Sequence, residues 1–181
     1  MLVIVFVGLP GSGKSTLAKL TKNSIQGSVL ISSDFLRQKL FLHFTEEDKK
    51  LIYSDTFKQV IYNAIFATLD IVKNTKETVI LDATFTKREN QELLETKINS
   101  WKSKLLYVVC EAPESIISQR LNKRSNTSNL SDADFSVYLK LKQNYNIERF
   151  GTNSILINTS NPIGECLKSV MSEINDSYIS K

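Results

Sequence analysis

The sequence predicts an α/β domain of three layers, in which helices cover both faces of a five-stranded parallel sheet. Five short apolar runs recur along the chain, at 2–7, 29–31, 78–81, 105–109 and 155–157. Each run is continuously apolar rather than alternating, which is typical of parallel strands buried on both faces. Helical patterns separate the runs, and this alternation favours right-handed crossovers with helices on either side of the sheet.

The bulk properties fit one globular domain. A chain of 181 residues can bury a full core, so we expect a single domain over 1–181. No apolar run reaches membrane-spanning length, and Met1 leads directly into the first strand, which leaves no signal peptide. Cys110 and Cys166 lie in apolar segments without zinc-site spacing, and we expect buried, reduced thiols. We therefore expect a cytoplasmic protein with no membrane partner; the sequence does not indicate an oligomeric state.

The first strand runs into a glycine-rich loop. Residues 8–15 read Gly-Leu-Pro-Gly-Ser-Gly-Lys-Ser and fit G-x-x-x-x-G-K-[ST], with a helical pattern beginning at Ser15. Its glycines permit backbone conformations closed to residues with a Cβ, so successive N–H groups can face phosphate oxygens at a helix N-terminus. We expect the loop to hold ATP through Gly8, Pro10, Gly11, Ser12, Gly13, Lys14, Ser15 and Thr16.

Two side chains of this loop have distinct expected roles. Lys14 supplies a mobile charge for the β- and γ-phosphates, and the Ser15 hydroxyl is placed to ligate Mg²⁺. A dinucleotide-binding fingerprint would need a third glycine where Thr16 stands, so a nucleoside triphosphate is the better ligand.

The helical segments have their own signals. Apolar residues at i, i+3 and i+4 predict one long helix from Phe57 to Val72. The sequence 86–89 fits a capping box that opens the next helix, and Pro113 suits the first turn of another. Further helix starts are predicted at 131–134 and at 161–162.

Polar residues follow the strands at the edge where open parallel sheets bind ligands. Asp34 follows the second strand, and Arg37 lies one turn later on the same helical face. Phosphoryl transfer needs a group that orients and deprotonates the acceptor, so we expect Asp34 to be the general base and Arg37 to hold the acceptor. The alternative is an N-capping aspartate beside a solvated arginine.

The third strand ends in Asp82-Ala83-Thr84. Asp82 resembles the acidic end of a Walker B strand and would hold Mg²⁺ or contact the acceptor; the alternative is a turn-forming aspartate. Thr84, Lys87 and Arg88 are weaker candidates for lining the acceptor side. Residues 158–160, after the fifth strand, either form the adenine-side loop or simply begin a helix.

Two arginines precede a small, polar stretch without periodicity. Arg120 and Arg124 lie four residues apart and can face one side of a helix, before the loop that ends near Leu130. A hinged loop that delivers arginines to phosphates is a lid, which we expect near 120–135. The alternative is a basic helix C-terminus that complements the helix dipole. His43, Trp101 and Arg149 give no functional signal.

Taken in order, these motifs resemble those of small P-loop kinases of the 5′-polynucleotide kinase and zeta-toxin-like group. The resemblance spans about residues 3–160 and rests on 8–16, Ser33-Asp34-x-x-Arg37, 81–84, Arg120-x-x-x-Arg124 and 131–134. It implies a nucleoside-kinase-like P-loop NTPase fold with strand order 2-3-1-4-5 and a lid. It also implies Asp34 as the base, Arg37 on an acceptor phosphate, Arg124 on the ATP phosphates and Arg120 against adenine.

These expectations describe an ATP- and Mg²⁺-dependent kinase acting on a hydroxyl group. The first acceptor hypothesis is a polynucleotide or nucleotide 5′-hydroxyl. A small metabolite such as a sugar, nucleotide sugar or antibiotic is the alternative, because the chain has no attached phosphatase or ligase domain and no aromatic and basic stripe for single-stranded bases. A regulatory ATPase that transfers phosphate only to water is the alternative of another class.

Overall fold

The computed structural model describes residues 1–41, 54–75, 78–125 and 135–176, with the side chains of Arg124 and Ser125 excepted. His43 and the helix start predicted at 131–134 lie outside the described residues, as does 126–134, most of the expected lid.

Five parallel strands form the central sheet, as predicted. They are β1 (Leu2–Val7), β2 (Val29–Ser32), β3 (Val79–Asp82), β4 (Lys104–Glu111) and β5 (Ser154–Asn158). Their order is β2-β3-β1-β4-β5, which confirms the P-loop NTPase fold and the strand order expected from the sequence. The polar residues Ser32, Asp82 and Asn158 are the last residues of their strands.

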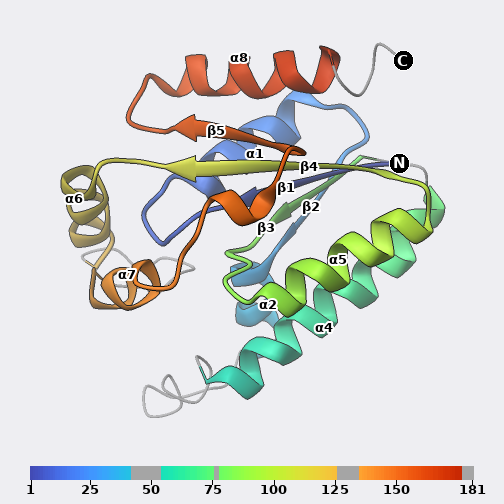
Figure 1. Ribbon diagram of the computed structural model, residues 1–181, viewed down its shortest axis with the longest axis horizontal. Helices are drawn as coiled ribbons and strands as arrows, with labels where there is room; N and C mark the ends of the chain where they lie inside the picture. Colours follow the sequence, from blue (N-terminus) through green and yellow to red (C-terminus); the bar gives the residue numbers. More distant parts are fainter. Residues whose placement is uncertain (42–53, 76–77, 126–134, 177–181) are drawn as a thin grey trace.

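Helices cover both faces of this sheet (Figure 1). α1 (Lys14–Ser24) and α8 (Ile163–Ile174) pack on one face, and α4 (Asp55–Val72) and α5 (Arg88–Ser100) pack on the other. Alternate residues of β1 enter two separate cores: Val3, Val5 and Val7 face α4 and α5, whereas Ile4 and Phe6 face α1 and α8. Burial on both faces explains why the strand sequences are continuously apolar.

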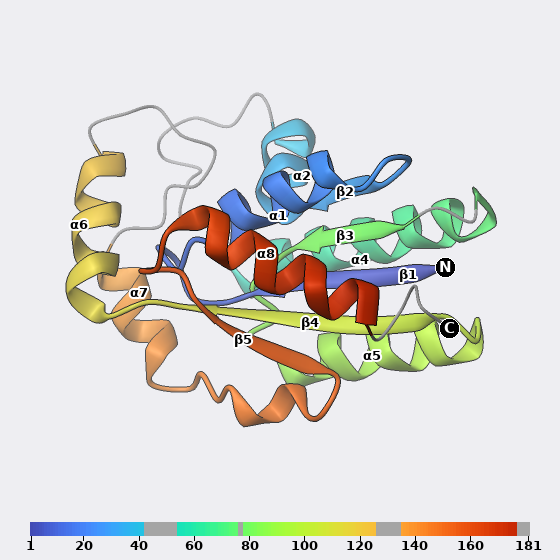
Figure 2. The ribbon, with the colours of Figure 1, turned by 90° about the horizontal axis from the view of Figure 1, so that it is seen from above.

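The other elements lie around the ends of the sheet. They are α2 (Ser33–Leu40), η1 (Lys73–Thr75), α6 (Glu114–Ser125), α7 (Phe135–Lys142) and η2 (Glu148–Phe150). Figure 2 shows α6 and α7 beyond the carboxyl end of β4. A small apolar cluster of Leu9, Ile117, Leu121 and Tyr138 joins both helices to the glycine-rich loop. No helix in the described part of the chain is long and apolar enough to cross a membrane.

The helix starts include one wrong prediction. The capping box at 86–89 does not form, because α5 begins at Arg88 after Lys87 and has no side-chain cap. Thr86 belongs instead to the preceding loop, where its carbonyl accepts a hydrogen bond from Arg149 at 2.8 Å. The predicted long helix is confirmed and begins two residues earlier than Phe57, where Ser54 caps it by accepting from the Phe57 amide. Pro162 is the N-cap of α8, as expected.

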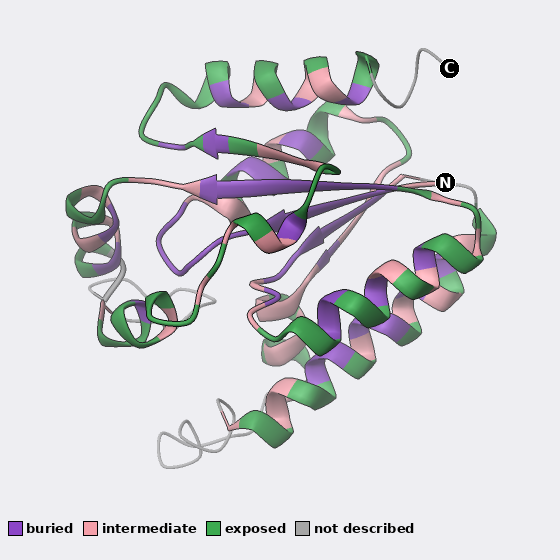
Figure 3. Cartoon of the chain, in the orientation of Figure 1, coloured by how far each residue is buried: buried purple, intermediate pink, exposed green. Residues whose placement is uncertain are grey.

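The buried faces of α4 and α5 line the inner side of their layer (Figure 3). Leu69 of α4 is fully buried, and Ile71, two residues along the same helix, is 72% exposed.

We expect Leu69→Ala to lower the free energy of unfolding by about 2–5 kcal/mol, because it leaves a cavity between α4 and the sheet. Ile71→Ala is the matched control and should cost less than about 0.5 kcal/mol. Urea unfolding followed by circular dichroism measures both. Equal losses for the two variants would contradict the packing of α4.

Candidate active site

The sheet register brings three chain segments to one edge. Phe6 of β1 and Ser32 of β2 both pair with Asp82 of β3, so the three strands end side by side. The glycine-rich loop, the start of α2 and the segment after Asp82 therefore leave the sheet at the same level. These are the segments that the sequence assigned to phosphate, acceptor and metal.

The glycine-rich loop has the backbone shape that its sequence predicts. Gly8, Gly11 and Gly13 have φ angles of 150°, 81° and 84°. Gly13 is the N-cap of α1, and its carbonyl accepts hydrogen bonds from the amides of Thr16 and Leu17 at 3.1 Å. The loop therefore leads straight into a helix N-terminus, where free N–H groups and the helix dipole favour an anion.

Neighbouring segments close tightly around this loop. A Cβ on Gly8 would lie 2.5 Å from the Cys110 carbonyl oxygen, and one on Gly13 would lie 2.9 Å from the Thr159 hydroxyl oxygen. Real Cβ atoms do not approach other atoms so closely without a shift in one of them. Glycine is thus required here by space as well as by the positive φ angles.

Thr159 connects the loop to the rest of the edge. Its hydroxyl lies 2.7 Å from the Ser12 carbonyl oxygen and 3.0 Å from that of Glu111, so it can donate to either. The Arg120 guanidinium donates to the Thr159 hydroxyl at 2.9 Å, to its carbonyl at 2.7 Å and to the Gly11 carbonyl at 3.1 Å. Arg120 therefore links α6, the glycine-rich loop and the segment after β5; the side chain of Arg124 lies outside the described residues.

Gly13→Ala is expected to weaken MgATP binding by at least about ten-fold, since a left-handed alanine costs about 1–2 kcal/mol even before the contact with Thr159 is counted. Gly164→Ala in α8 is the control, because nothing lies within 4 Å of the added Cβ. Isothermal calorimetry with MgATP compares the two variants. Wild-type affinity for Gly13→Ala would contradict the role assigned to the loop.

Asp82 lies beneath the glycine-rich loop and is only 4% exposed. Burial raises the pKa of its carboxyl group above the ordinary value, while the Lys14 charge and the nearby Ser15 hydroxyl oppose the shift. Ser32 donates to its Oδ2 at 3.4 Å, and its Oδ1 is buried without a hydrogen-bond partner. A buried carboxylate beside Lys14 and Ser15 is the arrangement expected at the end of a Walker B strand.

These residues fit Mg²⁺. The cation prefers oxygen ligands and is held by one or two protein groups together with substrate phosphates. The Ser15 hydroxyl and the Asp82 carboxylate supply such oxygens, and the orphaned Oδ1 leaves capacity for a further contact. Within the described residues, no group of three or more His, Cys, Asp or Glu side chains forms a metal cluster. The nucleotide and water would therefore supply most of the ligands.

Asp82→Asn is expected to raise the thermal midpoint of the ligand-free protein while weakening Mg²⁺-dependent ATP binding by about 10- to 100-fold. A raised folded-state pKa means that ionised Asp82 destabilises the fold above its ordinary pKa of 3.8. The advantage of asparagine should be largest at neutral pH and shrink as the pH falls through the raised pKa. Calorimetric melting across pH, with and without MgATP, tests this; a lower midpoint for the variant at neutral pH would contradict it.

Asp34 and Arg37 form an ion pair in the first turns of α2. Ser32, not Asp34, is the N-cap of this helix and accepts from the Phe35 amide. The alternative interpretation of an N-capping aspartate beside a solvated arginine is therefore wrong, because both side chains are largely buried and face each other. Asp34 is also close enough to Asp82 for its charge to raise the pKa of that carboxyl group.

The weaker acceptor-side candidates differ in their placement. Thr84 lies close enough to the Tyr62 hydroxyl to lower the pKa of that tyrosine, against the larger rise caused by burial. Lys87 pairs with Asp55 at 3.2 Å. Arg88 pairs with Glu92 at 2.6 Å, and its side chain is 81% exposed on α5.

Sequence reasoning missed two residues on this side of the edge. Tyr62 of α4 places its hydroxyl 2.9 Å from the Phe85 amide, which donates to it. Arg149 of η2 donates to the carbonyl oxygens of Phe85 and Thr86. A tyrosine in a helical apolar stripe and a lone arginine carry no motif, so no pattern in the sequence could have found them.

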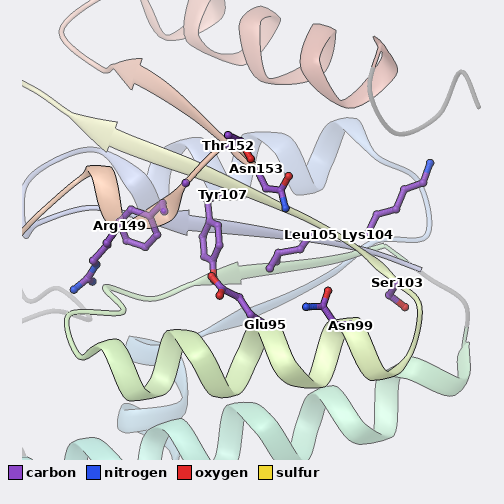
Figure 4. A pocket seen from close by; sticks show the side chains of 11 residues that line it. Glu95, Asn99, Ser103, Lys104, Leu105, Tyr107, Arg149, Thr152 and Asn153 are labelled. Carbon is purple, nitrogen blue, oxygen red and sulfur yellow. The ribbon is translucent and has the colours of Figure 1, made fainter.

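A cavity in the described part of the chain lies away from this edge. It has a volume of about 470 Å³ and lies between α5, the start of β4 and residues 149–153 (Figure 4). Glu95 accepts a hydrogen bond there from the Tyr107 hydroxyl at 3.1 Å. No residue of the glycine-rich loop lines this cavity. It is therefore distinct from the edge of the sheet at which the glycine-rich loop lies.

The comparisons with known proteins agree with this geometry. A family model described as "AAA domain" matches residues 3–147, which include the glycine-rich loop, Asp34, Arg37 and Asp82. The chain belongs to this AAA-domain family. No curated protein matches its sequence. The narrower polynucleotide-kinase and zeta-toxin-like group remains a prediction for this family member.

Solved structures of similar fold come from several organisms. A gluconokinase from Sinorhizobium meliloti has a TM-score of 0.69 at 19% identity, covering 96% of this chain and 91% of its own. A sugar kinase from Janibacter sp. has a TM-score of 0.71 at 15% identity, with 97% and 95% covered. Kti12 from Chaetomium thermophilum, in complex with ADP-AlF3, has a TM-score of 0.71 at 18% identity, with 97% and 98% covered. At these identities the likeness shows the fold.

Proposed function

We propose that this AAA-domain family member transfers the γ-phosphate of ATP to a hydroxyl group. The observation that carries the proposal is the Asp34–Arg37 ion pair, placed at the same sheet edge as the glycine-rich loop and Asp82. A protein that only binds or hydrolyses ATP needs no such pair opposite its phosphate site. A carboxylate there can accept a proton from an alcohol, and an arginine beside it can orient the acceptor.

Each residue has a role in this reaction. The loop amides and Lys14 bind the triphosphate, and Lys14 stabilises negative charge on the transferred group. Bound Mg²⁺, held through Ser15 and Asp82, would neutralise charge on the β- and γ-phosphates. Asp34 takes the proton of the attacking hydroxyl. Arg37 keeps the Asp34 carboxylate oriented and is placed to contact the acceptor.

Of the two arginines of the expected lid, only Arg120 has described side-chain contacts. Arg120 contacts the glycine-rich loop and Thr159, so it belongs to the nucleotide side of the edge. Contact of Arg120 with adenine and of Arg124 with the ATP phosphates remain proposals.

For the acceptor, we propose a small hydroxylated metabolite ahead of the nucleic-acid 5′-hydroxyl that the sequence first suggested. The support comes from the gluconokinase and the sugar kinase, whose chains are covered almost completely by this one. Because the fold is shared over nearly the whole of each chain, this protein has about the same segments available for an acceptor site as those two kinases.

The test is transfer of labelled γ-phosphate from ATP to a panel of acceptors: gluconate, neutral sugars, nucleosides, aminoglycosides and a 5′-hydroxyl oligonucleotide. Transfer to the oligonucleotide alone would reverse the order of acceptors. Acceptor-independent loss of ATP, unchanged by Asp34→Asn, would instead indicate a regulatory ATPase.

With an active acceptor, Asp34→Asn is expected to lower kcat by about 10²- to 10⁴-fold, because asparagine cannot take the proton. Calorimetry should show an affinity for MgATP within about two-fold of wild type, since Asp34 does not contact the triphosphate in this mechanism. Asp176→Asn, in an exposed position after α8, is the control and should leave turnover unchanged. Full turnover by Asp34→Asn would rule out the base assignment.

A further inference from the structure

We propose that Arg149 is a positioning residue for the acceptor side of the site. Its guanidinium donates to two successive carbonyl oxygens, of Phe85 and of Thr86, the latter at 2.8 Å. These residues follow Asp82 and Thr84 in the loop between β3 and α5. The inference rests on the proposed function, because it assigns this loop to the acceptor.

The loop needs such a contact because its backbone is in an unfavourable conformation. Phe85 has a φ angle of 46°, in the left-handed region that residues with a side chain rarely adopt. Such conformations persist where the surrounding structure fixes them, and they are common at functional sites. The Phe85 ring is buried against Tyr62 with centroids 5.2 Å apart, and its amide donates to the Tyr62 hydroxyl. Tyr62 and Arg149 thus hold the amide and the carbonyl of the same residue.

Arg149 is itself rigidly placed. Its guanidinium carbon lies 5.5 Å from the Tyr145 ring centroid and 4.9 Å from that of Phe150. Gln91 of α5 donates to its main-chain carbonyl at 2.9 Å. Figure 4 shows the side chain directed away from the labelled groups that line the cavity, toward the loop between β3 and α5. The fixed, planar guanidinium can therefore donate to both carbonyl oxygens at once, a geometry that the single ammonium of lysine cannot reproduce.

The loop that Arg149 holds is linked to the catalytic pair. Thr84 adjoins Phe85, whose amide donates to the Tyr62 hydroxyl, and both Thr84 and the charge of Arg37 lie close enough to lower the pKa of that hydroxyl. The loop, Tyr62 and Arg37 therefore lie on one side of the edge. The glycine-rich loop is fixed by separate contacts, to Thr159 and Arg120. Loss of Arg149 should for this reason disturb the acceptor side and spare the nucleotide side.

The experiment compares Arg149→Gln and Arg149→Lys with Glu148→Gln, a change of an exposed neighbour in the same turn. The first readout needs no acceptor: hydrogen exchange of the Phe85 amide, measured by NMR beside MgATP affinity. We expect Arg149→Gln to accelerate this exchange by about ten-fold or more, through loss of charge-assisted hydrogen bonds, with MgATP affinity within about two-fold of wild type. Arg149→Lys should give a Phe85 exchange rate between those of wild type and Arg149→Gln, and Glu148→Gln should match wild type.

The second readout uses whichever acceptor of the panel is phosphorylated. Arg149→Gln should raise the acceptor KM by about ten-fold and leave the ATP KM unchanged. Unchanged Phe85 exchange would overturn the proposal, as would a parallel loss of MgATP binding in both Arg149 variants, which indicates general loss of structure. If no acceptor is phosphorylated, the proposed function fails. The exchange result alone then decides whether Arg149 holds the loop.

Discussion

The closure of the glycine-rich loop against Thr159 is the constraint on which the nucleotide site depends. The amides of the loop have to be available to a ligand, so other contacts must fix the loop conformation. The Thr159 hydroxyl donates to the Ser12 carbonyl, and the Arg120 guanidinium donates to the Gly11 carbonyl. Hydrogen bonds to these carbonyl oxygens do not occupy the N–H groups that can face an anion, although the Ser12 amide donates within the loop to the Leu9 carbonyl.

The side of the edge that we propose for the acceptor is built by another set of interactions. Its backbone after β3 is held by hydrogen bonds with Tyr62 from one helix layer and with Arg149 from a turn just before β5. Asp82 stands between the two sides, because its strand pairs with β1 on one flank and β2 on the other. Burial raises the pKa of the Asp82 carboxyl group, so its ionised form costs stability that a bound cation could offset. In the proposed mechanism this cation lies between the two sides.

The separation of the two sides suits a phosphotransferase. In the proposed reaction a common sheet edge brings nucleotide and acceptor together, and the separate contacts of the two loops would let one loop change without disturbing the other. A gluconokinase, a sugar kinase and Kti12 share the fold at sequence identities below 20%.

The sequence by itself determined the strands, their parallel burial, the phosphate loop and the positions of Asp34 and Asp82. These depend on local patterns, since hydrophobic periodicity and the glycine-lysine motif act over a few neighbouring residues. The sequence misplaced the start of α5, because the carbonyl of Thr86 is bound by Arg149, 63 residues away. Only the tertiary structure decided that Ser32 rather than Asp34 caps α2, that Arg120 contacts Thr159, and that Tyr62 and Arg149 bind the loop between β3 and α5. Such contacts join residues far apart in the chain, and no local preference of either partner specifies them.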